Sequence, residues 1–530
     1  MQMNRLLQRA NKRISLGGAA TLLMATTLIG QVLGFLRTMF VNASFLPTGP
    51  QSTDAYFAAF KIPDFFFLTL AAGALGVAFM PILAERLQKS DRRGVWELSY
   101  SLMNMMAIIM IIVSICILIF AEQLIHVVAP NLSPEQLHNA TTIMRLVSFN
   151  PLLFTLSGIF TSVQQTFGRF FFFAVGPIVY NLTIIASIFL FRNNIGLIGL
   201  GIGAAIGAVL QLLVVILGQI GLDFHYRPKI NLQSTDFKRI LRQLPARSID
   251  QGIDSINSIV ETNRARKIGD GYVSYYENAF TLHTAPVLLI GTAISTAAFP
   301  RLAERLAQNR TDLFRRDFRM VLEALVWISL PTAIIAFFCR GYLARIIFKA
   351  GAPEIALIFG ALSAAIFFRI LYSLFSRYFY ANKDTVTPLL VSLFAIGLNI
   401  LLAFVLARPN AYGALGLALA QTIVAACEVI ILFSIVVYRD HKMFDRVFWS
   451  NVGRSVSVSG FTILTAFVMV TLLPLGASDK GFLTLGFKLA AISTTTLVTH
   501  ISVSALFGLE QAKAVTGRVR RIILRPIKIQ

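Results

Sequence analysis

Apolar stretches of about twenty residues recur along the whole chain, separated by short polar and mostly basic segments. A run of roughly 20 apolar residues is the length that an α-helix needs to cross the hydrocarbon core of a bilayer. The pattern therefore predicts an all-α polytopic membrane protein. We expect fourteen transmembrane helices, with centres near residues 30, 68, 109, 153, 180, 208, 251, 288, 331, 367, 396, 425, 461 and 494.

Two segments far apart in the chain resemble each other. The first, AFKIPDFFFLTLAAGALGVAFMPILAERLQ, begins at Ala59, and the second, AFTLHTAPVLLIGTAISTAAFPRLAERLAQ, begins at Ala279. A further pair, IGLIGLGIGAAIGAVLQLL from Ile195 and YGALGLALAQTIVAACEVI from Tyr412, has nearly the same offset, 217 against 220 residues. Spans 1 to 6 and 7 to 12 are therefore interpreted as two six-helix bundles related by a parallel pseudo-two-fold axis, with two helices appended at the C-terminus.

This repeat sets the predicted organisation of the chain. Two bundles of this kind enclose a central cavity, in which a substrate binds near the middle of the membrane. The predicted segments are a basic N-terminus at 1–18, an N-lobe at 19–222, a C-lobe at 223–440, spans 13 and 14 at 441–508, and a basic tail at 509–530.

The net charge of +22 would suit a nucleic-acid-binding protein, so the distribution of the basic residues decides its meaning. With a cytoplasmic N-terminus, about 30 Lys and Arg residues fall in inside segments and about 9 in outside segments, as the positive-inside rule requires. We therefore expect both termini in the cytoplasm and no nucleic-acid partner. The three cysteines lie in apolar spans without metal-ligand spacing, and no catalytic constellation is present, so we expect a protein that is not an enzyme.

Span 2 carries charges that an isolated membrane helix would not tolerate. In TDAYFAAFKIPDFF, Asp54 and Lys61 lie two turns apart on one helical face, and Lys61 and Asp64 are i,i+3 neighbours. Pro63 kinks the helix between them. Because a charge at the bilayer centre costs at least about 2.5 kcal/mol, we expect these side chains to face one another or a water-filled cavity.

Spans 1 and 7 add polar groups to the same cavity. In span 1, Gly30 and Gly34 permit close helix packing, and Arg37 follows. Span 7, LPARSIDQGIDSINSIVETNRARK, has polar residues at intervals of three and four, the periodicity of one helical face. This polar stripe consists of Arg247, Asp250, Asp254, Asn257 and Glu261. A surface helix would show the same stripe, but the correspondence of span 7 with span 1 favours a cavity-facing helix. Arg369 and Glu428 are interpreted as snorkelling or paired structural residues.

DAYFAAFKIP followed by AFMPILAER resembles the signature of the MviN/MurJ family, bacterial lipid II flippases of the multidrug/oligosaccharidyl-lipid/polysaccharide exporter superfamily. VLGFLRTMFV in span 1 and FYANKDTVTPLLV at 379–391 fit the same family, and the resemblance covers the whole chain. It implies a carrier in the bacterial inner membrane that moves the undecaprenyl-pyrophosphate-linked peptidoglycan precursor lipid II from the inner to the outer leaflet by alternating access. Spans 13 and 14 would form a groove for the polyprenyl tail.

The cavity residues implied by this resemblance are only partly present. Of four cavity arginines, Arg37 is retained, whereas Gln31, Phe67 and Ala279 occupy the other three positions. The residues expected to contact the headgroup are Arg37, Lys61, Asp54, Asp64, Gln31 and, as a replacement cation, Arg247. Those expected to serve conformational change are Pro63, Gly30 and Gly34. A sodium site, as in some family members, would use Glu261, Asn399 and Thr422.

The loss of three arginines leaves other functions open. The chain could be a flippase for another polyprenyl-linked saccharide, or a transport-inactive homologue that acts as a scaffold for cell-wall synthesis proteins. A cation-coupled drug exporter is disfavoured by the motif of spans 1 and 2 and by the two extra spans. As a flippase we expect a monomer in contact with membrane lipids, with no cofactor other than sodium ions or the membrane potential as the coupling source.

Overall fold

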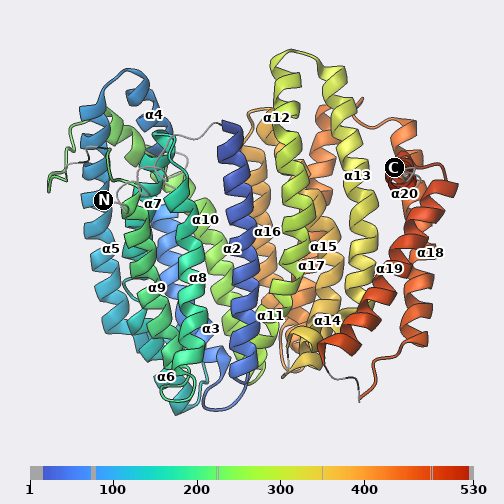
Figure 1. Cartoon of the computed structure of the whole chain (residues 1–530), viewed down its shortest axis with the longest axis horizontal. Coiled ribbons are helices and arrows are strands. Elements are labelled where there is room, and N and C mark those ends of the chain that lie inside the picture. Colours follow the sequence, from blue (N-terminus) through green and yellow to red (C-terminus); the bar gives the residue numbers. More distant parts are fainter. Residues whose placement is uncertain are drawn as a thin grey trace, which may run out of the picture. The chain divides into compact units, whose positions relative to one another are not determined.

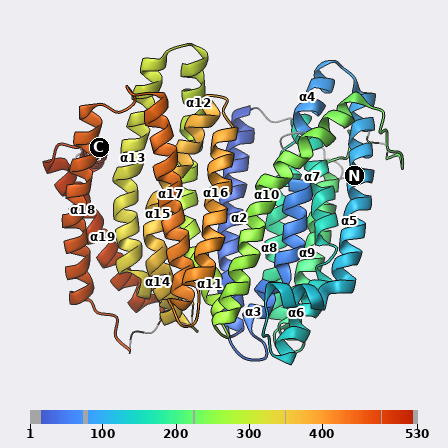
Figure 2. The same cartoon turned by 180° about the vertical axis from the view of Figure 1, so that it is seen from behind.

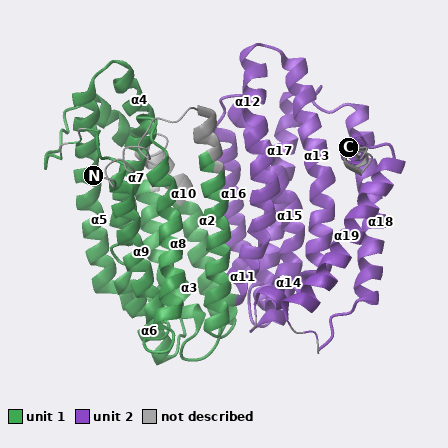
Figure 3. Cartoon of the chain, in the orientation of Figure 1, with its two compact units in different colours: residues 1–274 green, residues 275–530 purple. Residues whose placement is uncertain are grey.

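The computed structural model describes residues 16–72, 79–222, 224, 226–348, 350–477, 479 and 481–523 of the 530-residue chain. Within the helices, the side chains of residues 16–21, 24, 72, 243–251, 514 and 518–523 are outside the description. All regular structure in the described ranges is helical, which confirms the predicted all-α class. The chain forms two compact units, unit 1 at Met1–Ser274 and unit 2 at Tyr275–Gln530 (Figure 3).

The helices follow the predicted spans in order (Figure 1). Unit 1 contains α2 (Leu16–Ser44), α3 (Thr53–Phe67), η1 (Leu68–Ala72), α4 (Met80–Gln88), α5 (Arg92–Val128), α6 (Pro134–Leu146), α7 (Asn150–Thr166), α8 (Phe171–Phe191), α9 (Ile198–Leu217) and α10 (Thr235–Ile268). The following elements are α11 (Tyr272–Pro286), η3 (Val287–Thr292), α12 (Ala293–Ala307), α13 (Thr311–Phe338), α14 (Arg340–Ile347), α15 (Ala352–Ala381), α16 (Val386–Leu406), α17 (Gly413–Arg439), α18 (Arg446–Leu472), α19 (Phe482–Leu506) and α20 (Glu510–Ile523).

Eleven helical segments in the described part of the chain are long and apolar enough to cross a membrane. They correspond to predicted spans 3 to 6 and 8 to 14. The remaining three predicted spans are α2, α3 with η1, and α10, the segments in which the sequence places polar and charged groups. The chain is therefore a multi-pass membrane protein, and the total of fourteen spans stays a prediction.

The internal repeat has a structural counterpart in two π-helical segments. η1 follows α3, which contains Pro63, and η3 follows α11, which contains Pro286. Shifted by the repeat offset of 220 residues, η1 would occupy 288–292, and η3 occupies 287–292. Because π-helices are rare and often mark functional positions, their coincidence supports the interpretation of a duplicated unit.

Helix α10 packs within unit 1, against α3, η1 and α5 (Figure 2). Gly252 makes this close approach possible, because a Cβ atom there would lie 2.9 Å from Thr69 Oγ1 of η1. The compact units thus divide after Ser274, whereas the predicted repeat boundary lies between residues 222 and 223. The two divisions describe different things, since one follows contacts and the other follows sequence similarity.

In unit 2, α18 and α19 pack together and against α13 (Figure 1). Pro331 inside α13 has no N–H, so the carbonyl of Trp327 lacks its usual helical partner. His500 of α19 lies with Nε2 3.1 Å from this carbonyl and Nδ1 2.9 Å from Thr462 Oγ1 of α18. The indole of Trp327 donates to Ser504 Oγ at 2.9 Å. A buried polar network therefore fastens the predicted tail-binding helices to α13.

Candidate functional site

Asp54, at the start of α3, is fully buried and accepts four hydrogen bonds from the α10–α11 turn and its neighbours. Its Oδ1 accepts from the Ser274 N–H at 2.8 Å and from Ser274 Oγ at 2.7 Å, and its Oδ2 accepts from the Gly271 N–H at 2.8 Å. Arg266 Nη1 donates to Oδ2 at 3.1 Å. Asp54 is therefore a partner in a closed contact in this conformation, and its role in binding the headgroup stays a prediction.

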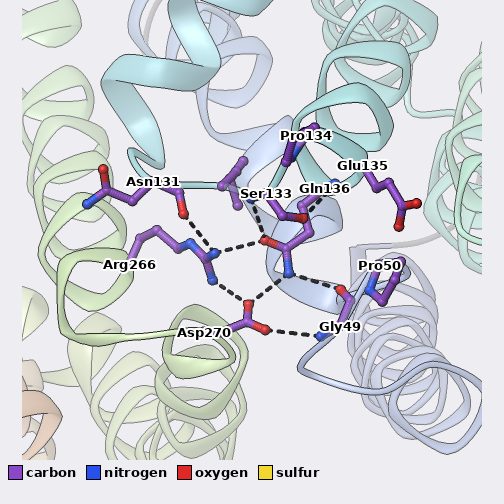
Figure 4. Close-up of a pocket in the computed structure, with 10 residues that line it drawn as sticks. Gly49, Pro50, Asn131, Ser133, Pro134, Glu135, Gln136, Arg266 and Asp270 are labelled. Atoms are coloured by element: carbon purple, nitrogen blue, oxygen red, sulfur yellow. Dashed lines mark hydrogen bonds and ion pairs between the residues drawn. The ribbon is translucent and has the colours of Figure 1, made fainter.

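Arg266, near the end of α10, is the centre of this contact. Besides Asp54, its guanidinium donates to Asp270 Oδ1 at 2.5 Å, to Gln136 Oε1 at 2.8 Å and to the Asn131 carbonyl at 3.0 Å (Figure 4). Gln136 also donates to Asp270 Oδ1 at 2.8 Å. We call this set of residues, Asp54, Arg266, Asp270, Gln136 and Ser274, the latch. It ties the α10–α11 turn to the starts of both α3 and α6.

The latch borders a surface pocket of about 740 Å³. The pocket is lined by the loop before α3, the start of α6, Arg266 and Asp270, as Figure 4 shows. Asp270 Oδ2 also accepts a hydrogen bond from the Gly49 N–H at 3.0 Å. Burial alone would raise the pKa of Asp270, but hydrogen bonds from Gly49, Arg266 and Gln136 outweigh it and hold this pKa below its usual value. The carboxylate is therefore ionised when the latch is closed.

Lys61, in the middle of α3, lies against the polar stripe of α10. Its ammonium donates to Ser258 Oγ at 2.7 Å. On the stripe, Asn257 Nδ2 donates to Glu261 Oε1 at 3.1 Å, and Glu261 is only 6% exposed. The predicted replacement cation, Arg247, belongs to α10, but its side chain lies outside the described residues. The structure thus brings Lys61 to the stripe of span 7 within unit 1.

Arg37, on α2, is partly exposed and forms no hydrogen bond or ion pair with any residue that the structure describes. Helix α2 packs against α8, and a Cβ atom at Gly34 would lie 4.0 Å from Asn181 Oδ1, next to Tyr180. Arg37 and Tyr180 therefore lie on two packed helices of unit 1, at a place that we call the Arg37 region. Asp64 of α3 is exposed. Tyr180 was not anticipated, because a single tyrosine in an apolar span is no sequence signal.

The glycines of span 1 have room around them in this conformation. A Cβ atom at Gly30 would meet no described atom within 4 Å, and one at Gly34 would first meet Asn181 Oδ1 of α8 at 4.0 Å. Gln31 is exposed on the same helix. The role of these glycines in close packing during conformational change stays a prediction.

Two positions where the resemblance implies arginine hold apolar residues in contact with other groups. The ring of Phe67 packs edge-on against Phe154 of α7, with centroids 5.5 Å apart, and Phe154 packs edge-on against Tyr180 at 5.3 Å. Ala279 of α11 is completely buried. Phe67 is therefore part of an aromatic chain that leads to the Arg37 region.

The remaining predicted sodium ligands lie in unit 2. Asn399 of α16 is 2% exposed. Thr422 of α17 donates at 2.8 Å to the Ala361 carbonyl of α15 and lies 2.9 Å from the Ala418 carbonyl. Two charged residues of unit 2 form a pair. Arg369 Nη1 donates to Glu428 Oε2 at 2.6 Å, which confirms the prediction that these are paired charges. No cluster of three metal-ligating side chains of His, Cys, Asp or Glu occurs in the described ranges.

The chain is similar to known proteins over most of its length. The family model described as "Lipid II flippase MurJ" matches residues 43–486. A probable lipid II flippase MurJ of Buchnera aphidicola is 26% identical over 387 residues, covering 70% of this chain and 75% of the relative. A probable lipid II flippase MurJ of Rhizobium tropici is 25% identical over 527 residues, or 94% of each chain.

Solved structures share the fold. A lipid II flippase MurJ in an inward closed conformation matches with a TM-score of 0.75 at 23% identity, over 95% of this chain and 100% of that one. An inward-facing multidrug resistance MATE family transporter of the MOP superfamily matches with a TM-score of 0.63 at 13% identity, over 79% of this chain and 99% of that one. Since the family model covers well over half of the sequence and the fold agrees, the chain belongs to the lipid II flippase MurJ family.

Proposed function

We propose that this chain moves lipid II from the inner to the outer leaflet of the bacterial cell membrane by alternating access. Membership of the family supports the substrate class, and the single observation that carries the mechanism is the latch. By the positive-inside rule we assign the N-terminus to the cytoplasm, and on this assignment α2 ends and α3 begins on the outer side. The latch then closes the outer end of unit 1, and it has to open whenever the substrate leaves outward.

Headgroup binding is assigned to the cations of unit 1. Arg37 has no partner among the described residues, so its five donors are open to a diphosphate. Lys61 adds a second cation, held by Ser258. Each charge-assisted hydrogen bond to the diphosphate contributes about 1.5–3 kcal/mol. Two such residues hold a diphosphate more weakly than four arginines would, so further contacts outside the diphosphate are needed.

A flippase for another polyprenyl-linked saccharide is the second candidate. The observation that favours it is Phe67, whose ring is built into the aromatic chain with Phe154 and Tyr180. A ring at this position suits a different headgroup from the one that an arginine would select. The scaffold hypothesis has no comparable contact in its favour, because Arg37 remains unpaired among the described residues.

Coupling to sodium is a further part of the proposal. Glu261 is a buried carboxylate within unit 1 and accepts a hydrogen bond from Asn257. A buried carboxylate and an amide oxygen are the hard oxygen ligands that such a cation requires. Replacing Glu261 by Gln should remove any dependence of transport on sodium, and dependence that survives the substitution would exclude this residue as a ligand. The chain acts as a monomer in the inner membrane, with both termini in the cytoplasm.

Complementation tests the function directly. The chain is expressed in a cell depleted of its own lipid II flippase, beside the variants Arg37→Ala and Arg145→Ala. Arg145 is an exposed arginine of α6 outside the Arg37 region, so it controls for loss of charge alone. We expect growth with the native chain and with Arg145→Ala, and none with Arg37→Ala. A native chain that is present in the membrane but does not support growth would favour the other polyprenyl-linked saccharide.

A further inference from the structure

Three aromatic rings form a continuous chain across three helices of unit 1. Phe67 of α3 meets Phe154 of α7 at an interplanar angle of 63°, and Phe154 meets Tyr180 of α8 at 83°. Edge-to-face contacts of this kind are favoured by the quadrupoles of the rings, and they leave at least one face of each ring without an aromatic partner. All three side chains are partly exposed. The aromatic chain therefore presents ring surface that the protein itself does not cover.

The polar end of this aromatic chain is the Tyr180 hydroxyl. It forms no hydrogen bond with a described residue. Helix α8, which carries Tyr180, packs against α2, which carries Arg37, and a Cβ atom at Gly34 would lie 4.0 Å from Asn181 Oδ1, next to Tyr180. Arg37 is likewise unpaired within the described ranges. A hydroxyl and a guanidinium on two helices that pack together, both without a partner among the described residues, can bind the oxygens of one ligand. The adjoining ring faces can at the same time hold an apolar surface of that ligand.

Core packing alone accounts for these rings less well. Aromatic residues that serve only the core of this protein, such as Phe318, Phe375 and Phe379, are almost completely buried. Phe67 and Tyr180, in contrast, lie at the edges of two different buried clusters, against which they are only partly covered. Part of each ring is therefore left uncovered by these buried clusters.

We propose that Phe67, Phe154 and Tyr180 form a sugar-binding subsite beside the diphosphate-binding Arg37. A sugar ring has one face of C–H groups, which packs on an aromatic face, and a rim of hydroxyls, which bonds to groups such as the Tyr180 hydroxyl. The sugar attached directly to the diphosphate of a polyprenyl-linked saccharide has both features. This inference rests on the proposed function. It adds that the headgroup is recognised through ring contacts with its sugar, which take the place of the missing arginines.

Measuring the binding of two lipids to the purified full-length chain distinguishes recognition of the sugar from recognition of the diphosphate. The probes are lipid II and undecaprenyl diphosphate, which carries the same diphosphate and tail without a sugar. Affinities are measured in lipid nanodiscs for the native chain and for Phe154→Leu, Tyr180→Leu, Tyr180→Phe and Arg37→Gln. The matched control is Phe160→Leu, because Phe160 lies on the same helix as Phe154 and also makes an edge-on contact, with Phe224.

Phe154→Leu and Tyr180→Leu should each weaken lipid II binding about tenfold, roughly the worth of one aromatic contact, while undecaprenyl diphosphate binds as before. Tyr180→Phe keeps the ring and should lose less. Arg37→Gln should weaken both lipids, and Phe160→Leu neither. Equal losses for both lipids, or none for lipid II, would overturn the sugar subsite while leaving the flippase intact. A native chain that binds lipid II no better than undecaprenyl diphosphate would contradict the sugar subsite and lipid II as the substrate.

Discussion

Arg266 and Asp54 form a buried ion pair, with Nη1 3.1 Å from Oδ2 and side chains that are 5% and 0% exposed. Removing one member of a buried pair leaves the other charge uncompensated, at a cost of about 3–5 kcal/mol. The pair is stable here because Asp54 also accepts hydrogen bonds from Gly271 and Ser274. Its loss should therefore open the latch and leave the rest of unit 1 folded.

Asp54→Asn and Arg266→Gln are expected to shift the protein toward an outward-open form. The measurement is the labelling of Ala58→Cys by a membrane-impermeant thiol reagent from the outer side, in a background without the three native cysteines. Ala58 is fully buried about one turn inward from Asp54, so it reacts only when the latch opens. Lys267→Gln, which removes an exposed charge beside Arg266, should leave the labelling rate unchanged. Equal labelling in all variants would show that the latch does not control access.

The latch should also weaken in acid through Asp270. Because the pKa of this carboxyl is held below its usual 3.8, the ionised form contributes stability that is fully present above that value. The contribution is lost as the pH falls through the lowered pKa. The midpoint of thermal unfolding, compared between the native chain and Asp270→Asn, should differ by a constant amount from pH 7 to about 5 and should begin to converge only as the pH falls below 3.8. A difference that is already lost well above 3.8, or that does not shrink at all as the pH falls below it, would contradict a contribution from the charge of this carboxylate.

Lys61→Met should lower the affinity for the lipid headgroup by about ten- to a hundred-fold, the equivalent of one charge-assisted contact. Ser258→Ala is the informative companion, because it removes the hydroxyl that holds the Lys61 ammonium and retains the charge. We expect it to weaken binding much less. If both substitutions weaken binding equally, Lys61 acts by fixing α3 to α10 instead of by contacting the substrate.

His500→Ala should lower the free energy of unfolding by about 1–3 kcal/mol, because the Trp327 carbonyl and Thr462 would lose a partner inside a buried network. His500→Asn places a shorter amide donor at the same position and should recover part of the loss. His441→Ala, at an exposed position, is the control. Thermal unfolding in detergent measures the difference, and equal stability of His500→Ala and the native chain would show that the network does not fasten α19.

The sequence predicted the helical fold and its order because spans of a fixed length and apolar composition are a direct requirement of the bilayer. It also grouped Lys61 with span 7, since charges inside a membrane have to find partners. The partner of Asp54 was not predicted, for a related reason. The sequence shows that a buried carboxylate needs a partner, but not that the partner is Arg266, more than two hundred residues away.

The sequence did not predict roles for Arg266 and Tyr180, because their roles depend on tertiary contacts. Arg266 lies at the end of a polar span, where a basic residue is ordinary, and only its four bonded neighbours distinguish it. Tyr180 is one aromatic residue in an apolar helix, and its importance follows from a hydroxyl without a described partner on the helix that packs against α2. The replacement of an arginine by Phe67 was visible in the sequence, but the rings that it joins were not.

The proline inside α13 has a genetic consequence. Pro331 leaves the Trp327 carbonyl unpaired, and His500 supplies the missing donor from another helix. Replacing Pro331 by Ala would restore a backbone N–H for this carbonyl, so the histidine would no longer be needed there. The loss of His500 should therefore be harmful in the presence of Pro331 and much less harmful in its absence. His500 would then be free to change only after Pro331 has changed, although the two residues lie far apart in the chain.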